Sequence, residues 1–85
     1  METNFLLMYL AQNLKLAAED EESEVKTYRV FEKTAREEGF EEIANAFKML
    51  SDVEHCHKLM FEDLYNQLKN FLDKSDKQLC HATIF

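Results

Sequence analysis

The stretch Arg36-Glu37-Glu38-Gly39-Phe40 contains the only glycine of this 85-residue chain, which has no proline. Glycine readily adopts the left-handed backbone conformation that ends a helix, and the carboxylates of Glu41 and Glu42 suit the positive end of a following helix. A turn this short makes the two flanking helices antiparallel neighbours. The stretch therefore predicts one helical hairpin.

Apolar residues recur every three or four positions on both sides of this turn, which is typical of amphipathic helices. The upstream seam is formed by Leu10, Leu14, Ala17, Glu21, Glu24, Tyr28, Phe31 and Ala35. The downstream seam is formed by Phe40, Ile43, Phe47, Leu50, Glu54, His57, Phe61, Leu64, Leu68 and Phe71. We expect an all-α fold with a single domain at residues 1–85. Its helices should span about 4–37 and about 40–73, followed by a polar tail at 74–85 that forms a short third helix or a frayed end.

The chain is acidic, with 17 acidic and 10 basic residues and a net charge of -7. Such a charge repels phosphate, so a nucleic-acid partner is not expected and cations are the better ligands. The two cysteines do not form a C-x-x-C pair, which favours a reduced, cytoplasmic protein. The longest apolar stretch, Phe5–Ala11, is far shorter than the roughly 20 residues that cross a bilayer, so no membrane partner is expected.

Ionisable side chains interrupt both seams at Glu21, Glu24, Glu54 and His57, where the pattern calls for apolar residues. Glu24 and Glu54 each lie 15 residues from Gly39, and Glu21 and His57 each lie 18 residues from it. In an antiparallel hairpin these pairs come level and form one polar layer. Burying such a layer is costly unless something compensates for it.

Two helices leave one side of the seam open, whereas a two-fold dimer closes it into a four-helix bundle. The dimer supplies a Glu from each of two helices and a Glu-x-x-His from each of the other two, the known ligand set of two-metal carboxylate bundles. Glu54 and His57 share one helix face because they are three residues apart. Oxygen ligands with one imidazole suit iron, with manganese or zinc as substitutes.

A structural interpretation of the same layer remains open, because buried Glu and His residues also fix register or partner choice in bundles. Glu24 belongs to an acidic run at residues 19–24 that could be a solvated face. Tyr28, one turn from Glu24, either hydrogen-bonds a ligand carboxylate or simply packs. His55 and Cys56 point away from the seam, and Cys80-His81 alone is a weak metal signal.

The segment from Asn13 to Leu64 resembles the rubrerythrin branch of the ferritin-like proteins. The resemblance is carried by residues 13–21, Tyr28, Ala35 with Glu38-Gly39-Phe40, Ile43-Ala44 with Phe47, and Val53-Glu54-His55-Cys56-His57. It implies a non-haem di-iron site with Glu21, Glu54 and His57 as ligands and Tyr28 beside them. It also implies ferrous iron oxidation and reduction of hydrogen peroxide or dioxygen.

Three departures from that family shape the hypothesis. Rubrerythrins usually carry both hairpins in one chain, so this chain would complete its site as a homodimer or higher oligomer. The rubredoxin-like cysteine pairs are missing, so electrons would come from a separate donor protein, or the protein would be a ferroxidase. Asp20 stands where the family often has glycine, and Glu24 matches an extra ligand of only one repeat. The rival hypotheses are iron oxidation for storage, as in encapsulated ferritins, and a non-catalytic dimerisation module.

Overall fold

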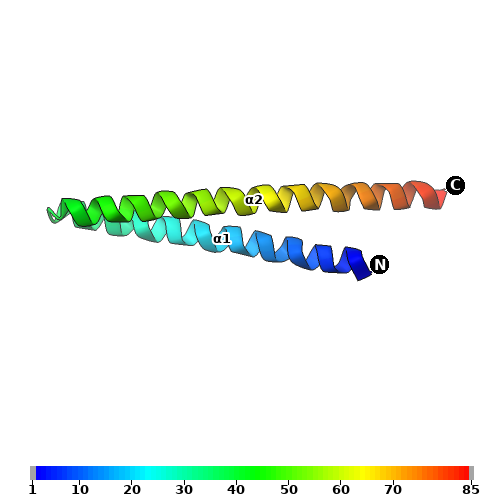
Figure 1. The fold of residues 1–85 in the computed structure, drawn as a ribbon, viewed down its shortest axis with the longest axis horizontal. Coiled ribbons are helices and arrows are strands. Elements are labelled where there is room, and N and C mark those ends of the chain that lie inside the picture. Colours follow the sequence, from blue (N-terminus) through cyan, green and yellow to red (C-terminus); the bar gives the residue numbers. More distant parts are fainter. Residues whose placement is uncertain (1, 85) are drawn as a thin grey trace.

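Two long helices form an antiparallel hairpin in the computed structural model, which describes the backbone of residues 2–84 and the side chains of residues 4–74. Helix α1 spans Glu2–Glu37 and helix α2 spans Glu41–Ile84 (Figure 1). The hairpin is 69 Å long, and the described residues form no strand. The all-α prediction is confirmed. None of the described helices combines the length and the low polarity that crossing a membrane requires.

Helix α2 is longer than the sequence predicted. We expected it to end near residue 73, but it continues to Ile84. The polar residues after 73 weaken the amphipathic pattern without containing a glycine or a proline to stop the helix. The expected third helix or frayed tail is therefore wrong, because residues 74–84 belong to α2.

Gly39 ends α1 as predicted, in the left-handed conformation with φ of +85°. The Phe40 N–H donates to the carbonyl of Ala35 at 2.9 Å, and the Gly39 N–H donates to that of Arg36 at 3.2 Å. These two bonds form a Schellman motif, which satisfies carbonyl groups that the helix end leaves free. The carbonyl of Phe40 then accepts a hydrogen bond from the Ala44 N–H in the first turn of α2.

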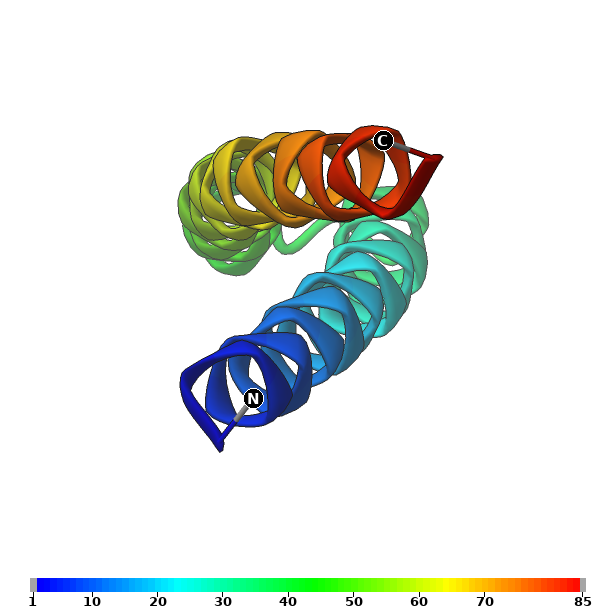
Figure 2. The ribbon, with the colours of Figure 1, turned by 90° about the vertical axis from the view of Figure 1, so that its right-hand side faces the viewer.

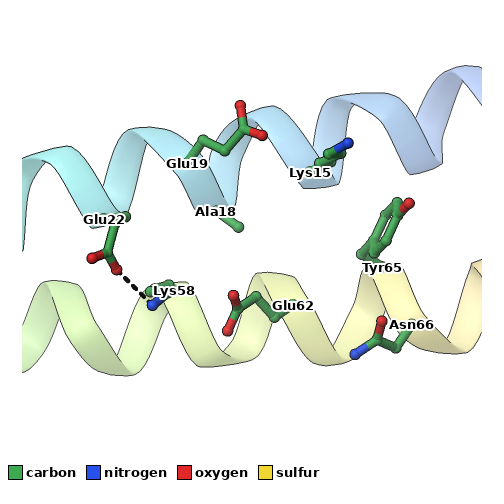
Figure 3. Close-up of a pocket in the computed structure, with 8 residues that line it drawn as sticks. All are labelled: Lys15, Ala18, Glu19, Glu22, Lys58, Glu62, Tyr65 and Asn66. Carbon is green, nitrogen blue, oxygen red and sulfur yellow. Dashed lines mark ion pairs between the residues drawn. The ribbon is translucent and has the colours of Figure 1, made fainter.

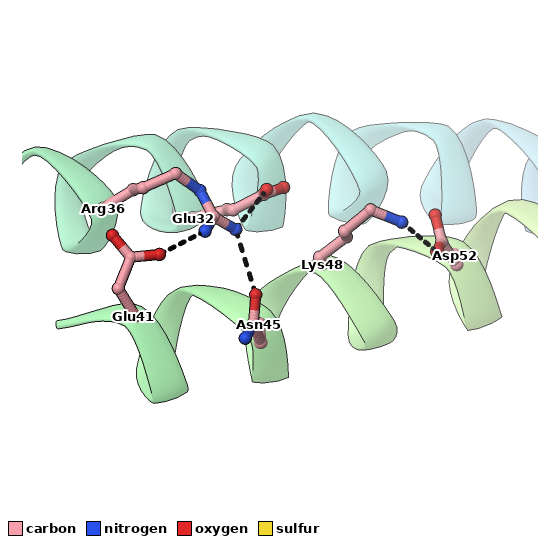
Figure 4. Close-up of polar contacts among 6 residues, drawn as sticks. All are labelled: Glu32, Arg36, Glu41, Asn45, Lys48 and Asp52. Atoms are coloured by element: carbon pink, nitrogen blue, oxygen red, sulfur yellow. Dashed lines mark hydrogen bonds and ion pairs between the residues drawn. The ribbon is translucent and has the colours of Figure 1, made fainter.

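Arg36 forms hydrogen bonds with both helices beside the turn. Its guanidinium donates hydrogen bonds to the carboxylates of Glu32 and Glu41 and to the side-chain oxygen of Asn45 (Figure 4). Glu32 lies on α1, whereas Glu41 and Asn45 lie on α2. This network links the two helices beside the turn and supports their antiparallel start.

Small side chains line the contact between α1 and α2. Five of the side chains that the structure describes are buried, and they follow a seven-residue spacing on each helix: Ala11, Ala18, Val25, Ala44 and Ser51. The Ser51 hydroxyl donates to the backbone carbonyl of Val25 at 3.5 Å, which satisfies it in the interior. A seven-residue repeat is that of helices that wrap around each other in a left-handed supercoil.

The predicted seams lie beside this contact line and not on it. Several of their large apolar side chains are about half exposed: those of Leu10, Phe31, Leu50, Leu64 and Phe71. The hairpin therefore has an apolar face that its own two helices do not cover. Toward the chain ends the helices diverge, so that the hairpin is narrow at its turn and wide at its open end (Figures 1 and 2).

Replacing Ala44 by Leu should destabilise the hairpin, because Ala44 is 0% exposed and the larger side chain would push α1 and α2 apart. We expect the free energy of unfolding to fall by about 1–3 kcal/mol, measured by urea denaturation followed by circular dichroism at a fixed chain concentration. The matched control is Ala46→Leu, two residues away on the exposed side of α2. Equal effects of the two substitutions would contradict the small-residue contact line.

Candidate metal centre

Glu21 of α1 meets Glu54 and His57 of α2 near the middle of the hairpin. The three residues each offer a ligand atom, and these atoms lie within 4.8 Å of one another. The Nδ1 atom of His57 lies 3.6 Å from Glu54 Oε2 and 3.8 Å from Glu21 Oε2. Donor atoms about 2.1 Å from a shared ion lie about 3–4 Å apart, so this spacing suits a metal better than a direct hydrogen bond.

The local sequence explains this meeting. Glu54 and His57 are one helical turn apart, so both project from the same side of α2. Glu21 and His57 are equally distant from Gly39, and the turn brings them level. The register that was predicted about Gly39 is therefore confirmed by the Glu21–His57 contact.

The Glu21 carboxylate has an oxygen that nothing in the described part of the hairpin satisfies. Glu21 Oε2 is buried and has no hydrogen-bond partner. A buried acceptor without a partner costs free energy, and more so when it is charged. A bound cation would remove that cost, and the donor set of two carboxylates and one imidazole matches the preferences of iron or manganese. The residues present therefore fit the metal that the sequence predicted.

The cluster is closed on the hairpin side and open on the other. The side chains of Glu21 and Glu54 are 20% and 17% exposed, whereas that of His57 is 48% exposed. His57 therefore lies at the border between the hairpin and the uncovered apolar face. The described side chains of one hairpin bring three ligand groups together, so a full coordination shell needs further donors.

The other two predicted site residues lie near the cluster without joining it. Glu24 is exposed and is not part of the three-residue group. Tyr28 is half-buried, and its ring stacks on that of Phe47 with centroids 6.3 Å apart. No hydrogen bond joins its hydroxyl to a carboxylate among the described side chains. The ligand role of Glu24 and the supporting role of Tyr28 stay predictions.

A second polar feature, which the sequence analysis missed, lies at the edge of the contact line that faces away from the cluster. Lys58 of α2 forms an ion pair with Glu22 of α1 at 2.5 Å (Figure 3). The pair raises the pKa of Lys58 and lowers that of Glu22. The signal in the sequence was the seven-residue series Ala44, Ser51, Lys58, in which a lysine follows two small residues.

An open groove surrounds this ion pair. It is lined by Lys15, Ala18, Glu19, Glu22, Lys58, Glu62, Tyr65 and Asn66, with charges of both signs (Figure 3). The groove shares no residue with the three-residue cluster. Each helix therefore presents the cluster on one side and the ion pair on the other.

The other cysteine and histidine side chains that the structure describes do not extend the cluster. Cys56 is an exposed free thiol, and His55 is half-buried. Neither belongs to the three-residue group within the side chains that the structure describes. Cys80 and His81 lie outside the described side chains.

Comparison with known proteins agrees with this geometry. The sequence matches the Rubrerythrin family over residues 12–83, which include most of both helices, the turn and the cluster. No curated protein and no solved structure matched the chain. Because the match covers most of the chain and contains Glu21, Glu54 and His57, this hairpin belongs to the rubrerythrin family.

Proposed function

We propose that two copies of this chain form a four-helix bundle that holds two iron ions and oxidises them with hydrogen peroxide or dioxygen. The observation that carries the proposal is the cluster of Glu21, Glu54 and His57, in which a buried carboxylate oxygen has no partner. Membership of the rubrerythrin family supports iron as the metal. The ligand roles, the dimer and the activity are all part of this proposal.

The uncovered apolar face supports a second copy as the partner. Large side chains that are about half exposed lie on both helices beside the cluster, at Leu10, Phe31, Leu50, Leu64 and Phe71. A monomer rarely leaves so extended an apolar surface in water. A second hairpin would cover this face and bring its own Glu21, Glu54 and His57 to the same layer.

The charges of such a dimer balance two ferrous ions. Glu21 and Glu54 of both copies supply four carboxylates, and the two His57 side chains are neutral ligands. Four negative charges equal the charge of two ferrous ions, so the filled layer would carry little net charge in the bundle interior. The two Glu24 carboxylates would bring the total to six, which equals the charge of two ferric ions.

The residues of this layer have separate tasks in the proposed reaction. A bound ferrous pair would supply the two electrons that reduce one hydrogen peroxide, with two protons, to two waters. The carboxylates of Glu21 and Glu54 would hold the metals and favour the higher charge of the oxidised state. His57 would bind through Nδ1, the nitrogen that faces both carboxylates. Apolar side chains around the layer would limit access of bulk water.

The shape of the hairpin favours an antiparallel dimer, with the turn of each copy beside the open end of the other. Glu21 lies near the middle of α1, which spans Glu2–Glu37. A two-fold axis through the cluster would therefore place α1 of one copy beside the full length of α1 of the other. The narrow turn of one copy would then enter the wide end of the other (Figure 2). A parallel dimer would instead place the acidic turns of both copies together, with Glu37, Glu38 and Glu41 in each.

An apolar groove beside the turn supports the same arrangement. Its apolar lining is formed by Val30, Phe31, Ala35, Phe40 and Phe47. In the antiparallel dimer this groove would face the N-terminal part of the partner's α1. That part contains the apolar stretch Phe5–Leu10, most of which is exposed in one hairpin.

Ferrous iron added without oxygen should bind at about one ion per chain, or two per dimer. Glu54→Gln keeps the size of the side chain and removes a ligand charge, so we expect iron affinity to fall at least about tenfold. Metal content after gel filtration, measured by plasma mass spectrometry, tests this prediction. Glu62→Gln is the matched control, because Glu62 is a half-buried glutamate of α2 outside the cluster. A dimer that binds no iron, or an equal loss of bound iron in both variants, would contradict the proposed metal centre.

Hydrogen peroxide should oxidise the ferrous protein at half an equivalent per iron. Two irons in one dimer supply the two electrons that one peroxide needs, whereas complete reduction of dioxygen needs four. Anaerobic titration followed by loss of the ferrous–ferrozine signal gives the endpoint. Ferrous iron mixed with the Glu54→Gln variant should be oxidised no faster than free ferrous iron in buffer. An endpoint at one peroxide per iron, with trapped hydroxyl radical, would contradict concerted two-electron chemistry.

A nitroxide label at Glu38→Cys should report the orientation of the dimer. The turn lies 18 residues from the cluster layer, so an antiparallel dimer places the two labels about 50 Å apart. A parallel dimer places them less than about 20 Å apart. Double electron–electron resonance on the zinc-loaded protein measures this distance. Cys56 and Cys80 are changed to Ala so that the label reacts only at residue 38. A short distance would overturn the antiparallel arrangement and leave the shared metal layer standing.

A further inference from the structure

The Lys58–Glu22 ion pair occupies the same level of the hairpin as the metal cluster. Lys58 directly follows His57 on α2, and Glu22 directly follows Glu21 on α1. Neighbouring residues point about 100° apart around a helix, so Glu22 and Lys58 point away from the cluster, and Lys58 takes the contact-line position seven residues after Ser51. A change in helix spacing at Glu22 and Lys58 therefore also moves the backbone of Glu21 and His57.

This level is also where the hairpin begins to open. On the turn side, Val25 and Ser51 are 1% and 2% exposed and share a hydrogen bond. On the other side, the helices diverge (Figure 1). Two grooves lie between them, at residues 4–22 of α1 and 58–73 of α2, and Figure 3 shows the one nearer the turn. Among the described side chains, no hydrogen bond or ion pair joins α1 to α2 beyond Lys58 toward the open end.

Repulsion between ionised Glu21 and Glu54 carboxylates would push the helices apart when no metal is bound. The carboxylates of Glu21 and Glu54 carry like charges on opposite helices, within 4.8 Å of each other. Repulsion at this distance in a partly buried layer favours a wider spacing of α1 and α2. The ion pair on the other side opposes that spacing, because Lys58 attracts Glu22 across the same two helices.

We propose that Lys58 and Glu22 are positioning residues, which clamp α1 to α2 at the opening of the hairpin and thereby hold Glu21 at ligand distance from Glu54 and His57. This inference rests on the proposed metal centre. A clamp that sets the ligand spacing before the metal arrives reduces the free-energy cost of binding it. The clamp acts through backbone spacing, without contact between Lys58 and the metal.

A direct effect of the Lys58 charge on the metal and an effect of Lys58 on helix spacing predict opposite results for the same substitution. If Lys58 acted only by its positive charge near the metal, Lys58→Met would strengthen cation binding and Glu22→Gln would weaken it. If the pair is a clamp, both substitutions weaken binding, because each of them breaks the same inter-helix contact. Met keeps most of the lysine stem beside the groove, and Gln keeps the size of Glu.

The experiment is a cobalt(II) titration of the full chain by calorimetry, with the visible absorption of bound cobalt as a second signal. We expect Lys58→Met and Glu22→Gln each to lower the affinity about three- to fivefold. The charge-reversed double variant Glu22→Lys with Lys58→Glu should restore it to within about twofold of the wild-type value. Lys48→Met is the control, because Lys48 pairs with Asp52 within α2 and joins no second helix.

Hydrogen exchange of the metal-free protein gives an independent readout. Loss of the clamp should speed amide exchange in α1 at residues 10–20, where no hydrogen bond or ion pair to α2 is described. Tighter cobalt binding by Lys58→Met, or no recovery in the double variant, would overturn the clamp while the metal centre stands. A wild-type chain that binds no cobalt would overturn both.

Discussion

Close approach of two helices along a line of small side chains is the constraint on which this structure depends. Val25, Ala44 and Ser51 are almost completely buried, and none of them is larger than valine. Helix axes that meet through such side chains lie closer together than axes separated by leucine or phenylalanine. This spacing brings a carboxylate of α1 within reach of a carboxylate and an imidazole of α2. Larger residues on the contact line would widen the hairpin and separate the ligand groups.

The contact line also divides the hairpin into two unlike sides. One side carries the cluster among large apolar residues, and the other carries ion pairs, such as Lys58–Glu22. Glu21 and Glu22 are neighbours in the sequence, but they serve different sides because each residue of a helix turns by about 100°. An acidic run in the sequence thus becomes one candidate ligand and one structural carboxylate.

Much of this architecture could be predicted from local signals. Gly39, flanked by helix-forming residues, defined the turn, and equal distances from Gly39 brought Glu21 and His57 level. The contact line was missed because alanine and serine in a helix look like ordinary helix formers and carry no apolar signal. The apolar seams, which give the strongest pattern in the sequence, lie on a face that the hairpin leaves uncovered. The end of α2 was missed because weak amphipathicity does not stop a helix that contains no breaker.

The half-exposed imidazole of His57 has a thermodynamic consequence. In the proposed dimer, a ligand set divided between two copies would make metal binding and chain association a single linked equilibrium. Iron would raise the affinity of the two chains for each other, and association of the chains would raise the affinity for iron by the same factor. In a cell, the number of assembled sites would rise more steeply than the number of chains. A chain that carried both hairpins would lose this dependence, and its two metal positions could evolve independently.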